Sequence, residues 1–387
     1  MTKRPARAFV VLALAVFSFQ LANGINRSIQ NNFFVEELGL RADQMGFLTT
    51  ARELPGFLTA VVAAAAMHLA PPHLGSLALT VMGLGYGGYG LVHSFAGLVA
   101  VAVVGSLGFH TWMPISNALG LSLASRGNAG QVLGRLQAVG FAGALISMGL
   151  VILLVQAVGY RLAFFASGAA MAIGALAIVT FPRNLAERPK QRLVFRRRYT
   201  LYYLLTFLDG CRGEVFLAFG VYLLVRQYHV DVRTVTLLLL ASSVISMALA
   251  PRVGRLIDTI GERRTLTFSY TCHFLTFLGF ALIHDGAVAI ALYVAYNVLM
   301  LFSMATNTYL KRTADPGDVA PSLAMGMTTM HISAMIVPIL GGMLWERFGF
   351  QLPFLVGAGF IVLSILVSRR IPARKPDVGP QVAAQST

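Results

Sequence analysis

Long apolar stretches dominate this sequence and leave few folds open to it. Twelve stretches of about 20 residues, nearly free of charged side chains, are long enough to cross a bilayer as helices. They lie approximately at residues 8–31, 44–68, 73–93, 96–122, 130–156, 160–182, 200–226, 234–254, 265–284, 287–310, 320–345 and 351–369. Because twelve is an even number, both chain ends lie on the same side. The pattern predicts an all-α membrane protein with twelve transmembrane helices.

The composition argues against a soluble protein. Of the 387 residues, 57% are hydrophobic and only 12% are charged, and the mean hydropathy is +0.73. A soluble domain carries about a quarter of charged residues to cover its surface. The two cysteines, Cys211 and Cys272, lie inside apolar stretches, so we expect neither a disulfide framework nor a metal site. No phosphate-binding GxxxxGK[ST] loop and no HExxH motif occurs in the sequence, so we expect no cofactor and no enzyme activity.

The net charge of +15 indicates how the chain is oriented in the membrane. With twelve spans, 22 of the 30 Lys and Arg residues fall on the side of the termini and 6 on the other, and Arg52 and Arg212 lie within spans. This bias predicts that both termini are cytoplasmic in a cytoplasmic (plasma, or bacterial inner) membrane, and it removes the reason to expect nucleic acid. An alternative stays open, because residues 1–23 also resemble a cleavable signal peptide. Cleavage would leave eleven spans and place the arginine-rich loops outside.

The longest polar loop divides the chain into halves, with six spans before it and six after it. We predict four segments: an N-terminal six-helix bundle (1–182), a basic cytoplasmic linker (183–199), a C-terminal six-helix bundle (200–371) and a disordered cytoplasmic tail (372–387).

A glycine-rich, charged run, GRLIDTIGERR, lies between the eighth and ninth stretches. It resembles the signature loop of the major facilitator superfamily, in its second copy. Weaker similarities follow in the right order: RGNAG at 126–130, Lys311-Arg312 followed by APSLAMG, PILGG at 338–342 and ERFG at 346–349. The resemblance implies two six-helix bundles that rock around a central cavity. It also implies that this run is a conformational latch, in which the aspartate meets a helix N-terminus of the opposite bundle. The latch residues are Gly254, Asp258, Gly261, Arg263 and Arg264.

The sequence departs from this family's pattern in two places. The first-half copy of the signature reads MHLAPPHLGSL and lacks both the acid and the arginine pair, so the latch looks one-sided. The fourth span has no arginine and the fifth has no Gly-Pro pattern, whereas many drug–proton antiporters of the family have these features. Both absences count against drug efflux without excluding it.

Polar side chains within the spans are functional candidates, because an intramembrane charge is costly unless it lines a cavity or has a partner. They form a stripe on the first span and gather on the second and seventh spans, which line the cavity in this family. We predict that the solute is bound by Arg212 first and Arg52 next, together with Gln20, Asn23, Arg27, His110 and Trp112. We predict that protons are carried by Asp209, Glu53 and Glu214.

Structural interpretations of the same residues stay open. Asp209 and Arg212 are three residues apart on a helix and can neutralise each other. Arg27 lies near the outer end of its span, where an interfacial role is equally compatible. His110 can be a buried, neutral histidine, and the same interpretation is favoured for His273 and His331.

These patterns predict a secondary active transporter that moves a small anionic organic solute by alternating access with proton coupling. The expected partners are that solute, a proton or another coupling ion and the lipid bilayer, and we expect a monomer. The alternative within transport is a proton-coupled multidrug exporter. A membrane enzyme or a sensor is disfavoured, since the sequence shows neither a nucleophile–base set nor a soluble output domain.

Overall fold

The computed structural model describes residues 3–57, 69–124, 128–183 and 195–372, and these residues form helices without any strand. The N-terminal half contains α1 (Lys3–Asn32) continued by the π-helix η1 (Phe33–Glu37), α2 (Ala42–Phe57), α4 (Pro71–Gly88) with η2 (Tyr89–Leu91), α5 (Phe95–Ser122) and α6 (Ala129–Ile178). The C-terminal half contains η4 (Arg197–Tyr199), α7 (Thr200–Tyr228), α8 (Val232–Ile260), α9 (Glu262–Leu282), α10 (Gly286–Leu299), η5 (Met300–Ser303), α11 (Met304–Thr313), α12 (Pro316–Phe348) and α13 (Gln351–Ser368).

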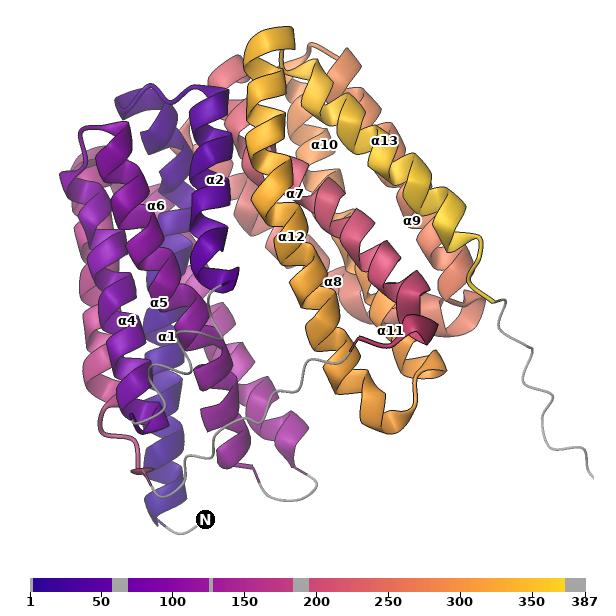
Figure 1. Cartoon of the computed structure of the whole chain (residues 1–387). Helices are drawn as coiled ribbons and strands as arrows, with labels where there is room; N and C mark the ends of the chain where they lie inside the picture. The colour runs from indigo at the N-terminus through magenta and orange to yellow at the C-terminus, as the bar shows by residue number, and fades with distance from the viewer. Residues whose placement is uncertain (1–2, 58–68, 125–127, 184–194, 373–387) are drawn as a thin grey trace, which may run out of the picture.

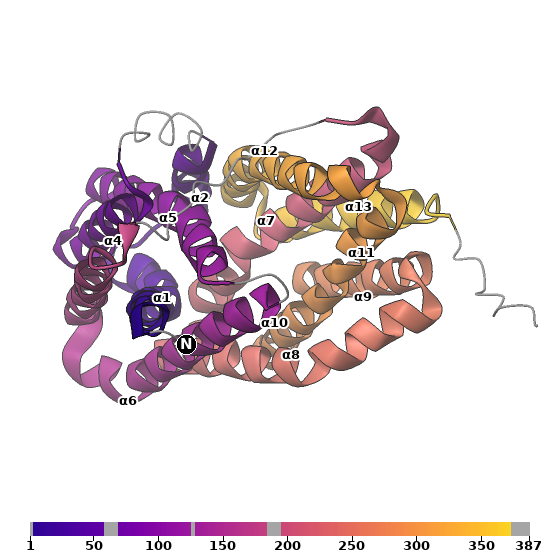
Figure 2. The same ribbon diagram turned by 90° about the horizontal axis from the view of Figure 1, so that it is seen from below.

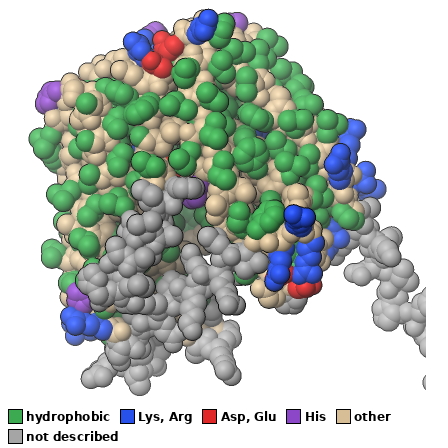
Figure 3. All heavy atoms as spheres, in the orientation of Figure 1, with side chains coloured by type: hydrophobic (Ala, Val, Ile, Leu, Met, Phe, Trp, Pro, Cys, Tyr) green, Lys and Arg blue, Asp and Glu red, His purple; other side chains and the backbone are tan. Residues whose placement is uncertain are grey.

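The described helices make twelve rods, as predicted. The helix α6 counts as two, because its backbone leaves the helical region at Gly159 (φ 75°, ψ 168°), a conformation that glycine adopts at little cost. One rod is continuous from α10 through η5 to α11. Eight helices within the described ranges are long and apolar enough to cross a membrane. Hydrophobic side chains cover the middle of the face seen in Figure 3, while charged side chains gather toward its ends.

The signature run is more helical than the sequence pattern suggested. The expected spans end at 254 and start again at 265, whereas α8 continues to Ile260 and α9 begins at Glu262. Only Gly261 separates the two helices, with φ 81° and ψ 160°. The expected span ends were wrong here because these helices extend beyond the apolar core of the bilayer. Outside that core, hydropathy does not indicate where a helix ends.

The rods form two bundles that lie side by side (Figures 1 and 2). In the N-terminal half, α1 packs along α6, and α4 packs against both α5 and α6. In the C-terminal half, α7 packs on α12 and α13, and α13 packs on α9. We call the end at which α1 begins and α13 finishes the terminal end, and the opposite end the far end.

The two halves meet mainly at the far end, where α2 lies beside α12 (Figure 1). Five hydrogen bonds join described residues of different halves: Asn32–Val230, Tyr222–Leu40, Ala42–Glu346, Arg233–Ile152 and His331–Glu53. The first four lie near the far end and the fifth lies at mid-depth. Toward the terminal end, the ribbons of the two halves draw apart (Figure 1).

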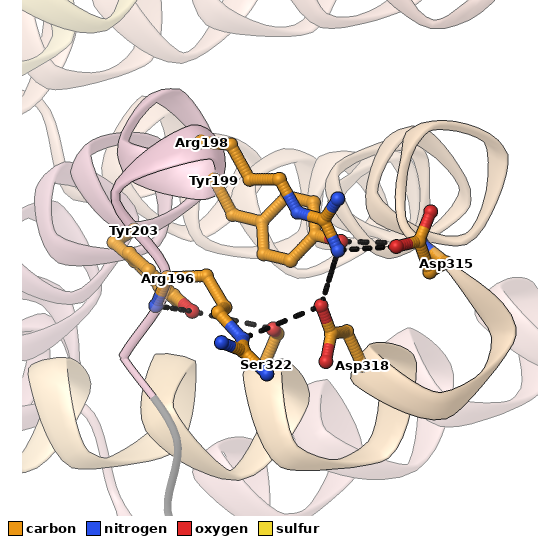
Figure 4. Close-up of polar contacts among 7 residues, drawn as sticks. All are labelled: Arg196, Arg198, Tyr199, Tyr203, Asp315, Asp318 and Ser322. Carbon is orange, nitrogen blue, oxygen red and sulfur yellow. Dashed lines mark hydrogen bonds and ion pairs between the residues drawn. The ribbon is translucent and has the colours of Figure 1, made fainter.

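A polar clamp ties the chain segment before α7 to the start of α12 (Figure 4). Arg198 donates to Asp315 at 2.5 Å and also to Asp318, and these two hydrogen bonds raise the pKa of the Arg198 guanidinium. Tyr199 donates to Asp318 at 3.1 Å, and Arg196 lies 3.5 Å from the same carboxylate. The end of the predicted linker is therefore fixed to the C-terminal half. Residues 184–194 of that linker, and the predicted tail after Pro372, lie outside the described residues.

Candidate functional site

The first element of the candidate site is Arg27, on the outer half of α1. Its side chain is exposed and forms no ion pair with a described residue. Its charge acts on the phenols of Tyr86 on α4 and Tyr293 on α10, so it lies between the two halves. An arginine whose charge acts on both halves is suited to more than anchoring a helix in lipid headgroups.

Arg52 supplies a second positive charge close to the first. It is half-buried on α2, and its Nη1 donates to Oε1 of Gln30 at 3.3 Å. Its charge also acts on Tyr86 and on Tyr89. No carboxylate of the described residues lies within ion-pair distance of Arg52. The charges of both arginines therefore act on Tyr86, and neither arginine has a carboxylate within ion-pair distance among the described residues.

A carboxylate and two histidines form a cluster at mid-depth, where the two halves meet. His331 Nδ1 on α12 lies 3.0 Å from Oε2 of Glu53 on α2, and both side chains are partly exposed. The ring centroids of His331 and His110 are 5.5 Å apart, and the ring planes make an angle of 66°. His110 itself packs on Gly56, where a β-carbon would meet its ring at 2.6 Å. The described residues contain no group of three side chains suited to a metal ion.

Glu214 is a second carboxylate that faces this cluster. It is half-buried on α7, and its Oε2 has no hydrogen-bond partner among the described residues. The charge of Glu53 acts on it across the boundary between the halves. Two acids from opposite halves and two histidines can exchange and hold protons in such an arrangement, because each can gain or lose one without leaving the cluster.

Asp209 and Arg212 form a separate, enclosed pair inside the C-terminal half. Arg212 Nη2 donates to Asp209 Oδ1 at 3.0 Å, and the Arg212 side chain is only 1% exposed. Asp209 Oδ2 accepts from Tyr270 at 3.1 Å and from Thr306 at 3.4 Å. The guanidinium also lies 5.8 Å from the ring centroids of Tyr270 and Tyr296. This geometry supports the mutual neutralisation of Asp209 and Arg212. The Nε and Nη1 atoms of Arg212 have no hydrogen-bond partner among the described residues, so its contact with the solute stays a prediction.

The other predicted solute-binding residues occupy different positions. Asn23 Oδ1 accepts from Tyr86 at 3.3 Å, which places it beside the two arginines. Gln20 packs over Gly140 of α6 and is half-buried. Trp112 is 1% exposed and packs against Phe19, so its ring is covered in this conformation.

The predicted latch residues lie at the terminal end. Gly254 is half-buried, and Asp258, Arg263 and Arg264 are exposed around the turn at Gly261. An ion pair that the motif did not predict joins the same turn to α11. Glu262, 6% exposed, lies 3.1 Å from Nε of Arg312.

Sequence reasoning missed three participants of the site. For His331 the sequence favours a buried, neutral histidine, and it gives no reason to select Tyr86 or Gln30. The partner of His331 is 278 residues away, so no helical spacing could reveal it. Gln30 had a usable signal, since it lies three residues after Arg27 on the same helix.

The family follows from comparison with known proteins. The family model described as Major Facilitator Superfamily matches residues 12–311 and 202–386. The chain belongs to the major facilitator superfamily. It is therefore an integral membrane transporter that moves small molecules, and not an enzyme.

Solved structures of this superfamily have the same fold. The nucleoside transporter NupG is 14% identical, with a TM-score of 0.78 over 95% of this chain and 100% of that chain. A bacterial homologue of the human lysosomal transporter Spinster, in an inward-facing and unoccupied conformation, is 13% identical, with a TM-score of 0.76 over 97% and 100%. The human organic anion transporter MFSD10 is 15% identical, with a TM-score of 0.58 over 94% and 99%. No curated protein matches the chain.

Proposed function

We propose that this chain transports a small organic anion with proton coupling, and that the anion binds at Arg27 and Arg52. One observation carries the proposal: two arginines near Tyr86 have no carboxylate within ion-pair distance among the described residues. Unpaired charge at this depth is costly unless it serves a cavity or a ligand. Guanidinium groups bind carboxylates and phosphates through two parallel hydrogen bonds, so an anionic solute suits them.

The proton carriers in this proposal are Glu53 and Glu214, with His331 and His110 as neighbours. Glu53 and His331 attract each other across the two halves, and a proton on Glu53 removes one side of that attraction. One oxygen of Glu214 has no hydrogen-bond partner among the described residues, and the charge of Glu53 acts on this side chain. Asp209, also predicted as a proton carrier, is less suited because Arg212 and two hydroxyl groups already hold it.

We further propose that this conformation faces the cytoplasm. The contacts between the halves gather at the far end, and the terminal end carries most of the Lys and Arg residues. With cytoplasmic termini, the closed end is the outer one. A monomer in the cytoplasmic membrane remains our expectation.

A thermal-shift screen on the purified protein tests the proposal. The panel contains carboxylates, sugar phosphates, uncharged sugars, nucleosides and cationic drugs, each at an acidic and a neutral pH. We expect selective stabilisation by one class of anions, since a ligand that binds the folded state raises its melting temperature. Stabilisation by cationic drugs alone would favour the multidrug alternative. The supporting observation for that alternative is the Oε2 atom of Glu214, which has no hydrogen-bond partner in the described part of the chain.

Variants then locate the site with the anion that gave the largest shift. Arg27→Ala and Arg52→Ala should each weaken binding by about 10- to 150-fold, as expected for one charge-assisted hydrogen bond worth about 1.5–3 kcal/mol. Arg369→Ala, which removes an exposed arginine at the end of α13, is the matched control and should leave the affinity unchanged. Equal affinities in all three variants would contradict the assignment.

A further inference from the structure

The start of α2 is capped by a carboxylate from the other half of the molecule. The backbone N–H of Ala42, the first residue of α2, donates to Glu346 Oε1 at 2.7 Å. The two residues are 304 positions apart in the chain. The first N–H groups of a helix have no partner within it, and negative charge stabilises that end. Glu346 therefore does for α2 what a capping side chain normally does from within the same segment.

The position of Glu346 on its own helix is unfavourable. It lies two residues before Phe348, the last residue of α12, where the helix dipole disfavours a carboxylate. The guanidinium carbon of the neighbouring Arg347 lies 5.3 Å from the ring centroid of Phe348. The favourable partner of Glu346 is thus the opposite helix, so its stabilisation depends on closure of the two halves.

Backbone contacts between the same helices show how close this closure is. A β-carbon on Gly46 would lie 2.1 Å from the carbonyl oxygen of Pro338, and one on Gly342 would lie 2.3 Å from that of Ala42. Tyr222 also donates to the carbonyl of Leu40, just before α2, at 2.9 Å. Such distances leave no room for a side chain, so the far end closes only while these glycines face the opposite backbone.

The other charges near the cap leave it available to Glu346. Asp43, at the start of α2, is engaged by Arg41 through a hydrogen-bonded ion pair. The hydrogen bond to Asp43 raises the pKa of Arg41, whose charge also acts on Glu346. Arg41 therefore adds to the positive potential at this helix start and supports the position of the Glu346 carboxylate.

We propose that Glu346 is a latch that holds the far end closed by capping α2 across the two halves. When the far end opens, the Ala42 N–H exchanges a charged acceptor for water, and the carboxylate is left at the unfavourable end of α12. A helix cap of this kind favours the closed state by about 5- to 30-fold. The predicted latch at Asp258 lies at the terminal end, so the two devices oppose each other. This proposal does not depend on the identity of the solute.

Single-molecule FRET on the full chain tests the latch without any solute. Dyes are attached at His93→Cys and Ile283→Cys, which are exposed at the far end in different halves, with Cys211 and Cys272 replaced by alanine. The protein is studied in lipid nanodiscs, and the ratio of open to closed molecules is measured. We expect Glu346→Ala to raise this ratio by about 5- to 30-fold. Glu346→Gln, which keeps an acceptor but loses the charge, should raise it less.

Two further variants make the outcome decisive. Gly342→Ala places a methyl group against the backbone of α2 and should open the far end with Glu346 intact, which shows that the dyes detect opening. Arg347→Ala changes the adjacent charge and should leave the ratio unchanged. If Gly342→Ala raises the ratio and Glu346→Ala leaves it at the wild-type value, backbone packing alone closes this end and the latch proposal is wrong.

Discussion

The enclosed pair of Asp209 and Arg212 makes an asymmetric prediction about stability. Both groups are buried, but only the carboxylate can lose its charge, by taking up a proton. Arginine stays protonated in proteins, whereas a carboxyl group can take up a proton and act as a hydrogen-bond donor. Removal of the acid therefore leaves a charge inside the C-terminal half, while removal of the arginine need not. We expect Asp209→Ala to be the more damaging substitution.

The magnitudes follow from the contacts of each side chain. In Asp209→Ala, an arginine that is 1% exposed loses its only ion-pair partner among the described residues, which costs about 3–5 kcal/mol. In Arg212→Ala, Asp209 keeps the hydroxyl groups of Tyr270 and Thr306. The losses are then two cation–π contacts at 5.8 Å and the ion pair, together about 1–3 kcal/mol. The double variant should be more stable than Asp209→Ala alone.

Thermal unfolding of the purified variants in detergent shows which substitution lowers the stability more. At about 2–4 °C per kcal/mol, Asp209→Ala should lower the melting temperature by about 6–20 °C. Arg27→Ala is the matched control, since it removes an exposed arginine that forms no ion pair with a described residue and should change stability by less than about 0.5 kcal/mol. An equal or larger loss in Arg212→Ala, or a double variant that equals the sum of the single ones, would refute the reasoning.

Three further predictions concern topology, the signature run and the clamp. Cysteines at Lys190→Cys and Pro380→Cys, in a chain with both native cysteines replaced, should resist an impermeant thiol reagent in intact cells; ready labelling of either would overturn the cytoplasmic assignment. Asp258→Asn should impair transport at near-normal expression, because the first-half loop has no acid to compensate; unchanged transport kinetics would leave the run as a simple turn. Arg198→Ala should leave the melting temperature close to the wild-type value, since the Arg198 side chain is 52% exposed and water screens its ion pairs; a large decrease would show that the clamp supports the fold.

The number and type of the helices could be predicted from the sequence because lipid imposes a simple rule. A segment must be apolar for about 20 residues and must satisfy its backbone hydrogen bonds internally. This rule applies within the hydrocarbon core of the bilayer and not beyond its surface. Hydropathy therefore predicts the spans, but it predicts an end at 254 for the span of α8, whereas the helix continues to Ile260. It also gave no sign of the clamp at Arg198 and Asp318.

The candidate site could be predicted only where its residues are neighbours on one helix. Asp209 and Arg212 are three residues apart, and their pairing was one of two interpretations left open by the sequence. The pairs His331–Glu53 and Glu346–Ala42 join segments separated by 278 and 304 residues. Their formation depends on how α2 lies against α12, which hydropathy and helical periodicity do not specify.

The position of these two long-range pairs links the proton to the conformational change in the proposed mechanism. Glu346–Ala42 and His331–Glu53 join the same two helices, and Ala42 and Glu53 are about 16 Å apart along α2 at 1.5 Å per residue. Between them, Gly46 and Gly342 hold the backbones in contact. A rigid helix cannot leave α12 at one of these points and stay at the others. A proton that weakens the pair at mid-depth therefore lowers the free energy needed to open the far end, and the loss of the Glu346 cap lowers it by a separate amount. Both effects act on the equilibrium between the open and the closed far end, so their contributions to the free energy of opening should add.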